Sequence, residues 1–169
     1  MVKVHLHPPI RRILTIVPHA LIGAAAAQIT TTPMAAFFVG IVTHLIFDFV
    51  PHLEPSTFFK KEYGDNWPRW VYAWIFLEFI LTIIFFIWLF FNKPSHDFSL
   101  IIWGALGGLS IDLIDHNPFK QRTRQWFGFK QIHLIHKFFH KDLPRNLWYF
   151  GLILLILILG GAVWLLLKF

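Results

Sequence analysis

Three ionisable residues lie four positions apart in an otherwise apolar stretch, "HLIFDFVPHLE" (44–54), namely His44, Asp48 and His52. On a helix a step of four residues turns about 40°, so the three side chains share one side, and Pro51 allows the last turn to loosen. Burying such groups in hydrocarbon costs several kcal/mol each unless something pairs with them. A metal ion would pair with them, because imidazole and carboxylate groups are the donors that zinc takes in proteins.

Further donors are expected at the same depth as this motif. Two aspartates end the apolar stretch "GALGGLSIDLIDH" (104–116), where the helix dipole is also negative and a cation is needed. A histidine-rich segment, "KQIHLIHKFFHK" (130–141), is predicted to lie beside them. The candidate metal ligands are His19, His44, Asp48, His52, Asp112, Asp115, His116, His133, His136 and His140.

This supply of donors exceeds the needs of one tetrahedral ion and predicts a divalent transition metal, with room for two or more ions. Zn²⁺ is favoured, with Mn²⁺ and Fe²⁺ as alternatives. A metal with an open position turns bound water into a nucleophile, and two metals suit attack on a phosphate or carbonyl. Asp115 or Glu78 is the predicted catalytic proton acceptor. Lys120, Arg122 and Arg124 are predicted to bind a substrate phosphate or headgroup.

Each of these features also has a structural interpretation. A buried His19 can simply donate to a backbone carbonyl, Glu78 can be its partner, and the histidines of 130–141 can form an interfacial face or a pH sensor. The basic and aromatic stretch 119–130 has the composition of a single-strand nucleic-acid binder. We favour anionic lipid headgroups as its partner, and nucleic acid is not expected.

The composition is that of a membrane protein. Of 169 residues, 56% are hydrophobic, 20 are Phe, 8 are Trp and only 14% are charged, against about 25% charged in soluble domains. The absence of cysteine excludes disulfides and thiolate ligands. We therefore expect an all-α integral membrane bundle of about five transmembrane helices in a single domain, 1–169. The expected spans are 13–29, 34–50, 70–91, 98–115 and 147–167, with an amphipathic interfacial helix at 130–141 on the inner side.

The distribution of Lys and Arg predicts the orientation of this bundle. With five spans, 13 of the 15 basic residues lie on the side of the N-terminus, and only Lys93 and Lys168 lie on the other. The positive-inside rule then places the N-terminus in the cytoplasm and the C-terminus across a bacterial-type inner membrane. The lipid bilayer is the expected partner. Small residues at 104–108 and 160–161 are suited to close helix packing within one chain or in a homo-oligomer.

The quoted motifs also carry a resemblance to a family. "PHALIGA" (18–24), "THLIFDFVPH" (43–52), "GALGGLSIDLIDH" (104–116) and the later histidine-rich stretch together resemble the small bacterial membrane-bound metal-dependent hydrolases, over most of the chain. The H-x3-D-x3-H core alone is similar to the zinc-dependent phospholipase C and single-strand nuclease group. Where the family usually has a proline before the aspartate of the fourth helix, this chain has Ser110. The resemblance implies six ligands, namely His19, His44, Asp48, His52, Asp112 and Asp115.

Together, these features predict a membrane-embedded hydrolase that cleaves a phosphoester or ester of a lipid-like substrate entering from the inner leaflet. The alternatives are a metal-ion or proton transporter and a membrane protein with a purely structural metal site. A transporter needs a path to both faces of the membrane. The outer halves of two spans, "FFVGIV" and "LTIIFFIWLFF", offer almost no polar residues for such a path.

Overall fold

The computed structural model describes residues 16–52, 69–93, 97–115, 123, 125–141 and 143–168, and these form helices and the short segments that connect them. The helices are α1 (Ile16–Ala27), α2 (Pro33–Phe49), α4 (Arg69–Asn92), α5 (Phe98–Asp115), α7 (Phe127–Phe139) and α8 (Trp148–Lys168), with a short 3-10 helix η1 (Arg145–Leu147) before α8. The predicted all-α class is confirmed for this part of the chain.

The apolar segments of the sequence correspond closely to these helices. The four helices α2, α4, α5 and α8 begin and end within one residue of the predicted segments. Helix α1 ends two residues earlier than predicted, and the hydroxyl of Thr30 donates to the carbonyl of Ala27 at 2.6 Å there. Helix α2 begins with a standard cap, since the side chain of Thr32 accepts from the Ala35 N–H and Pro33 occupies the first turn.

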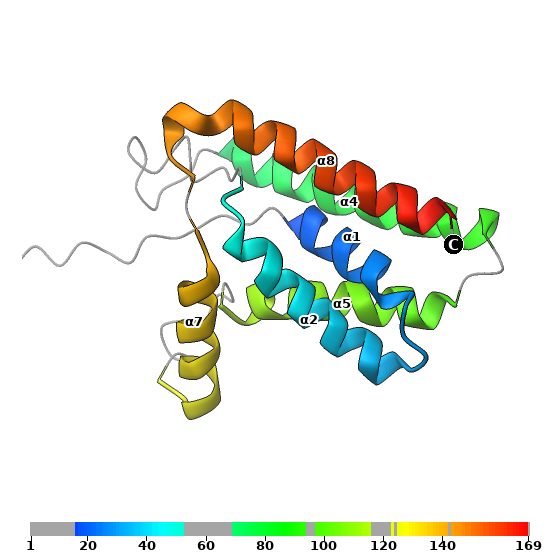
Figure 1. Ribbon diagram of the computed structural model, residues 1–169, viewed down its shortest axis with the longest axis horizontal. Coiled ribbons are helices and arrows are strands. Elements are labelled where there is room, and N and C mark those ends of the chain that lie inside the picture. Colours follow the sequence, from blue (N-terminus) through cyan, green and yellow to red (C-terminus); the bar gives the residue numbers. More distant parts are fainter. Residues whose placement is uncertain are drawn as a thin grey trace, which may run out of the picture.

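Three of the helices form the centre of the molecule. Helices α1, α2 and α5 pack against one another, α7 packs on α2 and α5, and α8 lies on α1. In Figure 1, α4 and α8 run along one side of this unit, and α7 crosses one end of it. At the opposite end, the ammonium of Lys93 donates to the carbonyl of Leu167 at 2.8 Å, which ties the ends of α4 and α8 together.

Glycines allow the central helices to approach closely. The carbonyl of Gly104 on α5 fills the space that a Cβ would need at both Gly23 on α1 and Gly40 on α2. A Cβ on Gly108 would collide with the carbonyl of His19. The small residues at 104–108 therefore serve packing within this chain, where the sequence had left packing between chains open.

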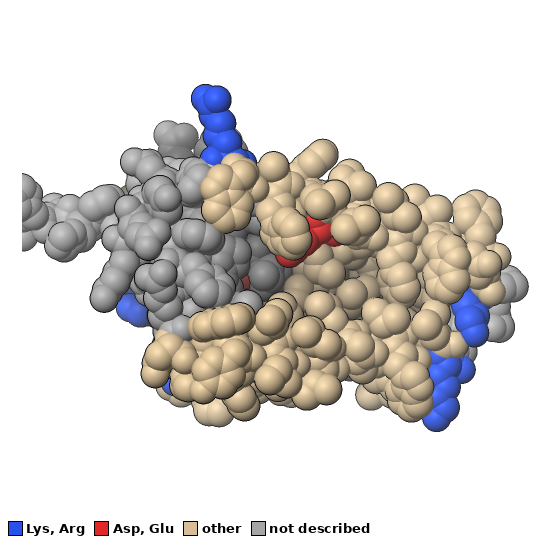
Figure 2. Space-filling model, turned by 90° about the horizontal axis from the view of Figure 1, so that it is seen from above, with Lys and Arg blue, Asp and Glu red and all other residues tan. Residues whose placement is uncertain are grey.

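The surface polarity of α2 is reversed relative to a helix of a water-soluble protein. Its buried side contains the two ionisable residues His44 and Asp48. Its exposed side consists of large apolar residues at helical spacing, namely Met34, Phe38, Val42, Ile46 and Phe49. Figure 2 shows a face on which the described residues are almost all uncharged, apart from an acidic group near its middle and Lys and Arg toward its two ends.

One described helix, α8, is long and apolar enough to cross a membrane by length and composition. Shorter apolar helices cover residues 17–27, 33–49, 76–92 and 98–114. The arrangement of five membrane spans therefore stays a prediction.

We expect Gly107→Ala to destabilise the protein, because its Cβ would collide with the backbone carbonyl of Phe37. Overpacking of this kind costs about 1–3 kcal/mol in a close-packed interior. Gly161→Ala on α8 is the matched control, since a Cβ there meets nothing within 4 Å and alanine favours a helix over glycine by about 1 kcal/mol. Thermal unfolding followed by circular dichroism should give a lower Tm for Gly107→Ala alone. Equal Tm values would contradict the close packing.

Candidate metal centre

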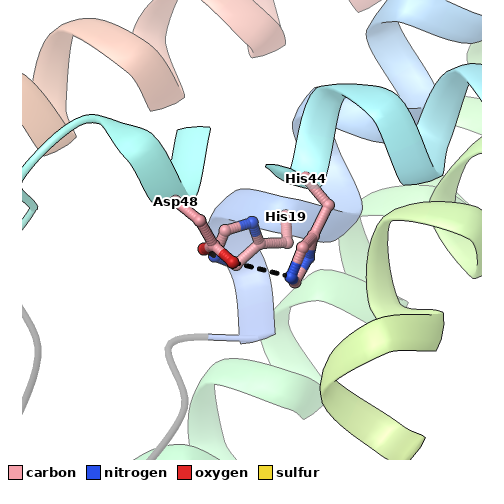
Figure 3. Close-up of side chains that lie close together, drawn as sticks. All are labelled: His19, His44 and Asp48. Carbon is pink, nitrogen blue, oxygen red and sulfur yellow. Dashed lines mark ion pairs between the residues drawn. The ribbon is translucent and has the colours of Figure 1, made fainter. Parts of the chain in front are cut away.

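The carboxylate of Asp48 lies at the centre of a buried cluster. The Nε2 atoms of His44 and His136 each lie 3.1 Å from its Oδ2 atom, and the Nε2 atom of His19 lies 3.5 Å from its Oδ1 atom. Figure 3 shows His19 and His44 turned toward this carboxylate from α1 and α2. Only 1% of Asp48 is exposed. Three helices therefore each bring an imidazole to one buried carboxylate.

A second carboxylate, that of Asp112 on α5, lies beside the first. Its Oδ1 atom is 3.5 Å from His136 Nε2 and 3.8 Å from His44 Nε2. His44 and His136 therefore lie between two aspartates. The donors form three overlapping sets, and within each set the ligand atoms lie within 4.8 Å of one another. The sets are His19–His44–Asp48, His44–Asp112–His136 and Asp48–His136–His140.

The helices fix these side chains by ordinary backbone contacts. His44 and Asp48 are one turn apart on the buried side of α2, so both face α1 and α5. The end of α7 is held against the end of α2, because the Lys141 N–H donates to the carbonyl of Asp48 at 3.0 Å. This bond sets the position from which α7 directs His136 into the cluster.

Hydrogen bonds to backbone carbonyls orient two of the imidazoles. His44 Nδ1 lies 2.6 Å from the carbonyl oxygen of Gly108, and His52 Nδ1 lies 2.9 Å from that of Val50. A carbonyl only accepts, so each Nδ1 carries a proton, and Nε2 of His44 is the ring atom that faces the carboxylates, where it carries a second proton or binds a cation. A metal-ligating histidine typically has such an orienting bond at its other ring nitrogen.

The spacing of the donors fits a cation held among them. Among the described residues, His44 Nε2 and Asp48 Oδ2 make no hydrogen bond of acceptable direction, although they are 3.1 Å apart. A lone pair that faces a carboxylate is repelled unless a proton or a cation lies between them. Donors bound at about 2.0–2.1 Å around a tetrahedral zinc ion are roughly 3.3–3.4 Å apart. The five nitrogen–oxygen distances of 3.1–3.8 Å lie around that value.

A second row of histidines lies next to the first. The ring of His52 is 5.8 Å from that of His19 and 5.6 Å from that of His140, measured between centroids. His140 is half-buried and belongs to the set formed with Asp48 and His136. The number of donor side chains in this region is therefore larger than the four ligands that one tetrahedral ion needs.

Other residues that the sequence suggested do not enter this cluster. The carboxylate of Glu78 accepts a hydrogen bond of 2.6 Å from the indole of Trp74 on the same helix and belongs to none of the three sets. His133 lies on α7 but is likewise outside these sets. Asp115 ends α5, and its side chain is not among the described ones. His116, Lys120, Arg122 and Arg124 lie outside the described residues.

Two contributors to the site were not predicted from the sequence. They are the carbonyl of Gly108, which orients His44, and the N–H of Lys141, which positions α7. The paired glycines of α5 suggested close packing but gave no sign of this hydrogen bond. A backbone contact between distant segments has no local signal in a sequence.

No family model, no curated protein and no solved structure matches the chain.

We expect the purified protein to contain at least about one equivalent of transition metal per chain, the least that a site of this donor set would hold. His136→Ala should lose most of this metal, because it removes an imidazole that faces both Asp48 and Asp112. His133→Ala, on the same helix, is the matched control and should keep it. Elemental analysis after reconstitution with Zn²⁺ measures both variants.

An equal metal content in the two variants would contradict the assignment of ligands. Wild-type protein that holds no metal after reconstitution would show instead that protons bridge the imidazoles and carboxylates.

Proposed function

We propose that the protein is a membrane-embedded, metal-dependent hydrolase that cleaves a phosphoester or carboxyl ester in a lipid-like substrate at the inner membrane surface. The observation that carries this proposal is the buried cluster around Asp48, into which His44 directs Nε2 because Gly108 holds its Nδ1 proton. The proposed metal is Zn²⁺, held by His19, His44, Asp48, Asp112 and His136, with His52 and His140 available to a second ion.

The number and kind of donors favour catalysis over a structural role. A structural zinc is closed by four ligands, usually rich in cysteine, whereas catalytic zinc has His and carboxylate ligands and an open position. This chain has no cysteine. A bound metal would supply an activated water and polarise the scissile group. The protein would hold the ligands in place, and Asp115, one turn after Asp112 on α5, remains the candidate proton acceptor.

The location of polar side chains argues against transport. Among the described residues, the fully buried polar side chains are His19, His44, Asp48, His52, Thr82, Asp112 and His136. All of these except Thr82 belong to the cluster or its second row. A transporter needs polar groups that lead from the site to both faces. The small apolar residues Ala24, Ala27 and Ala36 fill the bundle beyond the cluster instead.

A membrane location is supported by the surface. The apolar residues of α2 face outward and its ionisable residues face inward, as expected where the solvent is hydrocarbon. Helix α8 has the length and composition of a membrane span. Helix α7 lies across the end of the bundle where the cluster is found (Figure 1), as an interfacial helix would. In this proposal five helices cross the bilayer, with the cluster at the cytoplasmic side.

The hydrolase proposal predicts activity that depends on the cluster. Reconstituted with Zn²⁺, the wild-type protein should cleave at least one of three probes: bis(p-nitrophenyl) phosphate, p-nitrophenyl esters of fatty acids, or phosphatidylglycerol in mixed micelles. EDTA should abolish the activity and Zn²⁺ should restore it. Asp48→Asn should lower kcat/KM by roughly a hundredfold or more, because it removes charge from the site that activates water.

His133→Ala should retain activity within about threefold, since His133 lies outside the ligand sets. Folded, metal-loaded protein that cleaves none of the probes would reject the hydrolase and leave the structural metal site.

The proposed orientation can be tested directly because the chain contains no cysteine. Single substitutions Lys141→Cys and Lys168→Cys place one exposed thiol near the cluster and one at the end of α8. In intact bacterial cells, a membrane-impermeant maleimide should label only Lys168→Cys, and Lys141→Cys should react after permeabilisation. Labelling of both positions from the same side would contradict the five-span topology.

A further inference from the structure

An apolar cavity of about 400 Å³ lies between α4 and α5. Its walls are the stretches from Phe79 to Phe91 on α4 and from Phe98 to Leu109 on α5, and Ala20 of α1 contributes to the lining. Thr82 alone among the lining residues has a polar side chain, and its hydroxyl already donates to the Glu78 carbonyl at 2.9 Å. A volume of this size is typical of ligand pockets, but this lining offers no groups to orient a polar ligand.

The cavity is long enough to hold a hydrocarbon chain. The α5 wall runs from Phe98 to Leu109, which is eleven steps along the helix and roughly 16 Å at 1.5 Å per residue. The hydrocarbon core of a bilayer is about 30 Å thick, so one leaflet is about 15 Å. A hydrocarbon chain about as long as one leaflet is thick would fit along this wall. In the proposed topology it would reach from the level of the metal centre past the bilayer midplane toward the Phe98 end of α5.

The two ends of the cavity differ in chemistry. At one end the rings of Phe90 and Phe98 are in edge contact, 4.8 Å apart between centroids. At the other end, Ala20 directly follows His19, and Leu109 lies one turn before Asp112 on α5. The apolar stripe of α5 therefore leads from the aromatic end directly to a carboxylate of the metal centre.

The side of the cavity is open to the apolar surface of the molecule. Ile83 and Ile87 on α4 and Ile102 and Leu106 on α5 line it and are 39–54% exposed. In a bilayer these residues would border an entrance for a chain arriving sideways from the surrounding lipid.

We propose that this cavity binds the hydrocarbon chain of the substrate and thereby places the scissile group of a membrane lipid at the metal centre. The inference rests on the proposed hydrolase function and names its substrate as a lipid with at least one chain of leaflet length. The headgroup end of the chain lies near Leu109 and the methyl end near Phe90 and Phe98.

Photolabelling of the wild-type protein tests this placement without a need for turnover. Two phosphatidylglycerol probes are compared in vesicles, one with a diazirine near the ester of the acyl chain and one with a diazirine at the chain terminus. Mass spectrometry should locate adducts of the first probe near Ala105 and Leu109, and adducts of the second near Phe90 and Phe98. Labelling of the cavity in the same pattern by both probes would overturn the proposal.

The second part of the photolabelling experiment uses a variant whose side chain fills the cavity. Ala105→Phe should abolish cavity adducts but not those on the exposed side of α8, for example at Ile153 and Ile156, which report surrounding lipid. Ala73→Phe is the matched control, because Ala73 is exposed on α4 and does not line the cavity. Metal content equal to wild type shows that each variant is folded. Unchanged cavity adducts in Ala105→Phe would also overturn the proposal.

The outcomes separate this inference from the function on which it rests. Depth-ordered labelling without hydrolysis of any probe would reject the hydrolase and leave a chain-binding cavity. Hydrolysis by metal-loaded protein without depth-ordered labelling would reject the cavity as the chain site and leave the hydrolase.

Discussion

The buried carboxylate of Asp48 requires positive charge around it, and the arrangement of the helices follows from that requirement. An ionised carboxylate taken out of water costs several kcal/mol even after the protein relaxes, unless cations or well-placed donors surround it. Here α1, α2 and α7 each contribute an imidazole within 3.5 Å of it. The imidazoles of His44 and His136 also face Asp112, so the cluster is stable only when protons or a metal ion balance two carboxylates. Occupancy of the centre and association of these helices are therefore coupled.

The same coupling explains why the central helices are joined through glycine. Nitrogen–oxygen distances of 3.1–3.8 Å between side chains of four helices require those helices to be close together at one level. Gly23, Gly40 and Gly104 permit that approach, because a Cβ at any of them would collide with a neighbouring backbone. Gly108 contributes twice, since it packs against the His19 backbone and its carbonyl orients His44. Packing and site geometry thus depend on the same few residues.

The sequence predicted the helices but not the direction in which each donor points. Long apolar runs define their own ends, so α5 agrees with the predicted segment at both ends. The rotation of a helix about its axis is decided by tertiary packing. His133, His136 and His140 all belong to the predicted histidine stripe, yet the docking of α7 brings His136 and His140, but not His133, into a ligand set. Glu78 was predicted to lie level with the cluster, but its carboxylate accepts a hydrogen bond from Trp74 on its own helix.

The proposed hydrolase would have to receive water and hydrocarbon at one point, and two features of the structure are consistent with that requirement. The cluster lies where α7, with exposed Lys137 and Lys141, crosses the end of the apolar helices. Charged side chains at that end favour headgroups and water. The cavity beside α5 begins one turn from Asp112 and is lined by apolar side chains. A centre farther from α7 would lie away from these charged side chains, and one farther from α5 would not adjoin the cavity, so the place of the His–Asp cluster between the two supports the proposed lipid substrate.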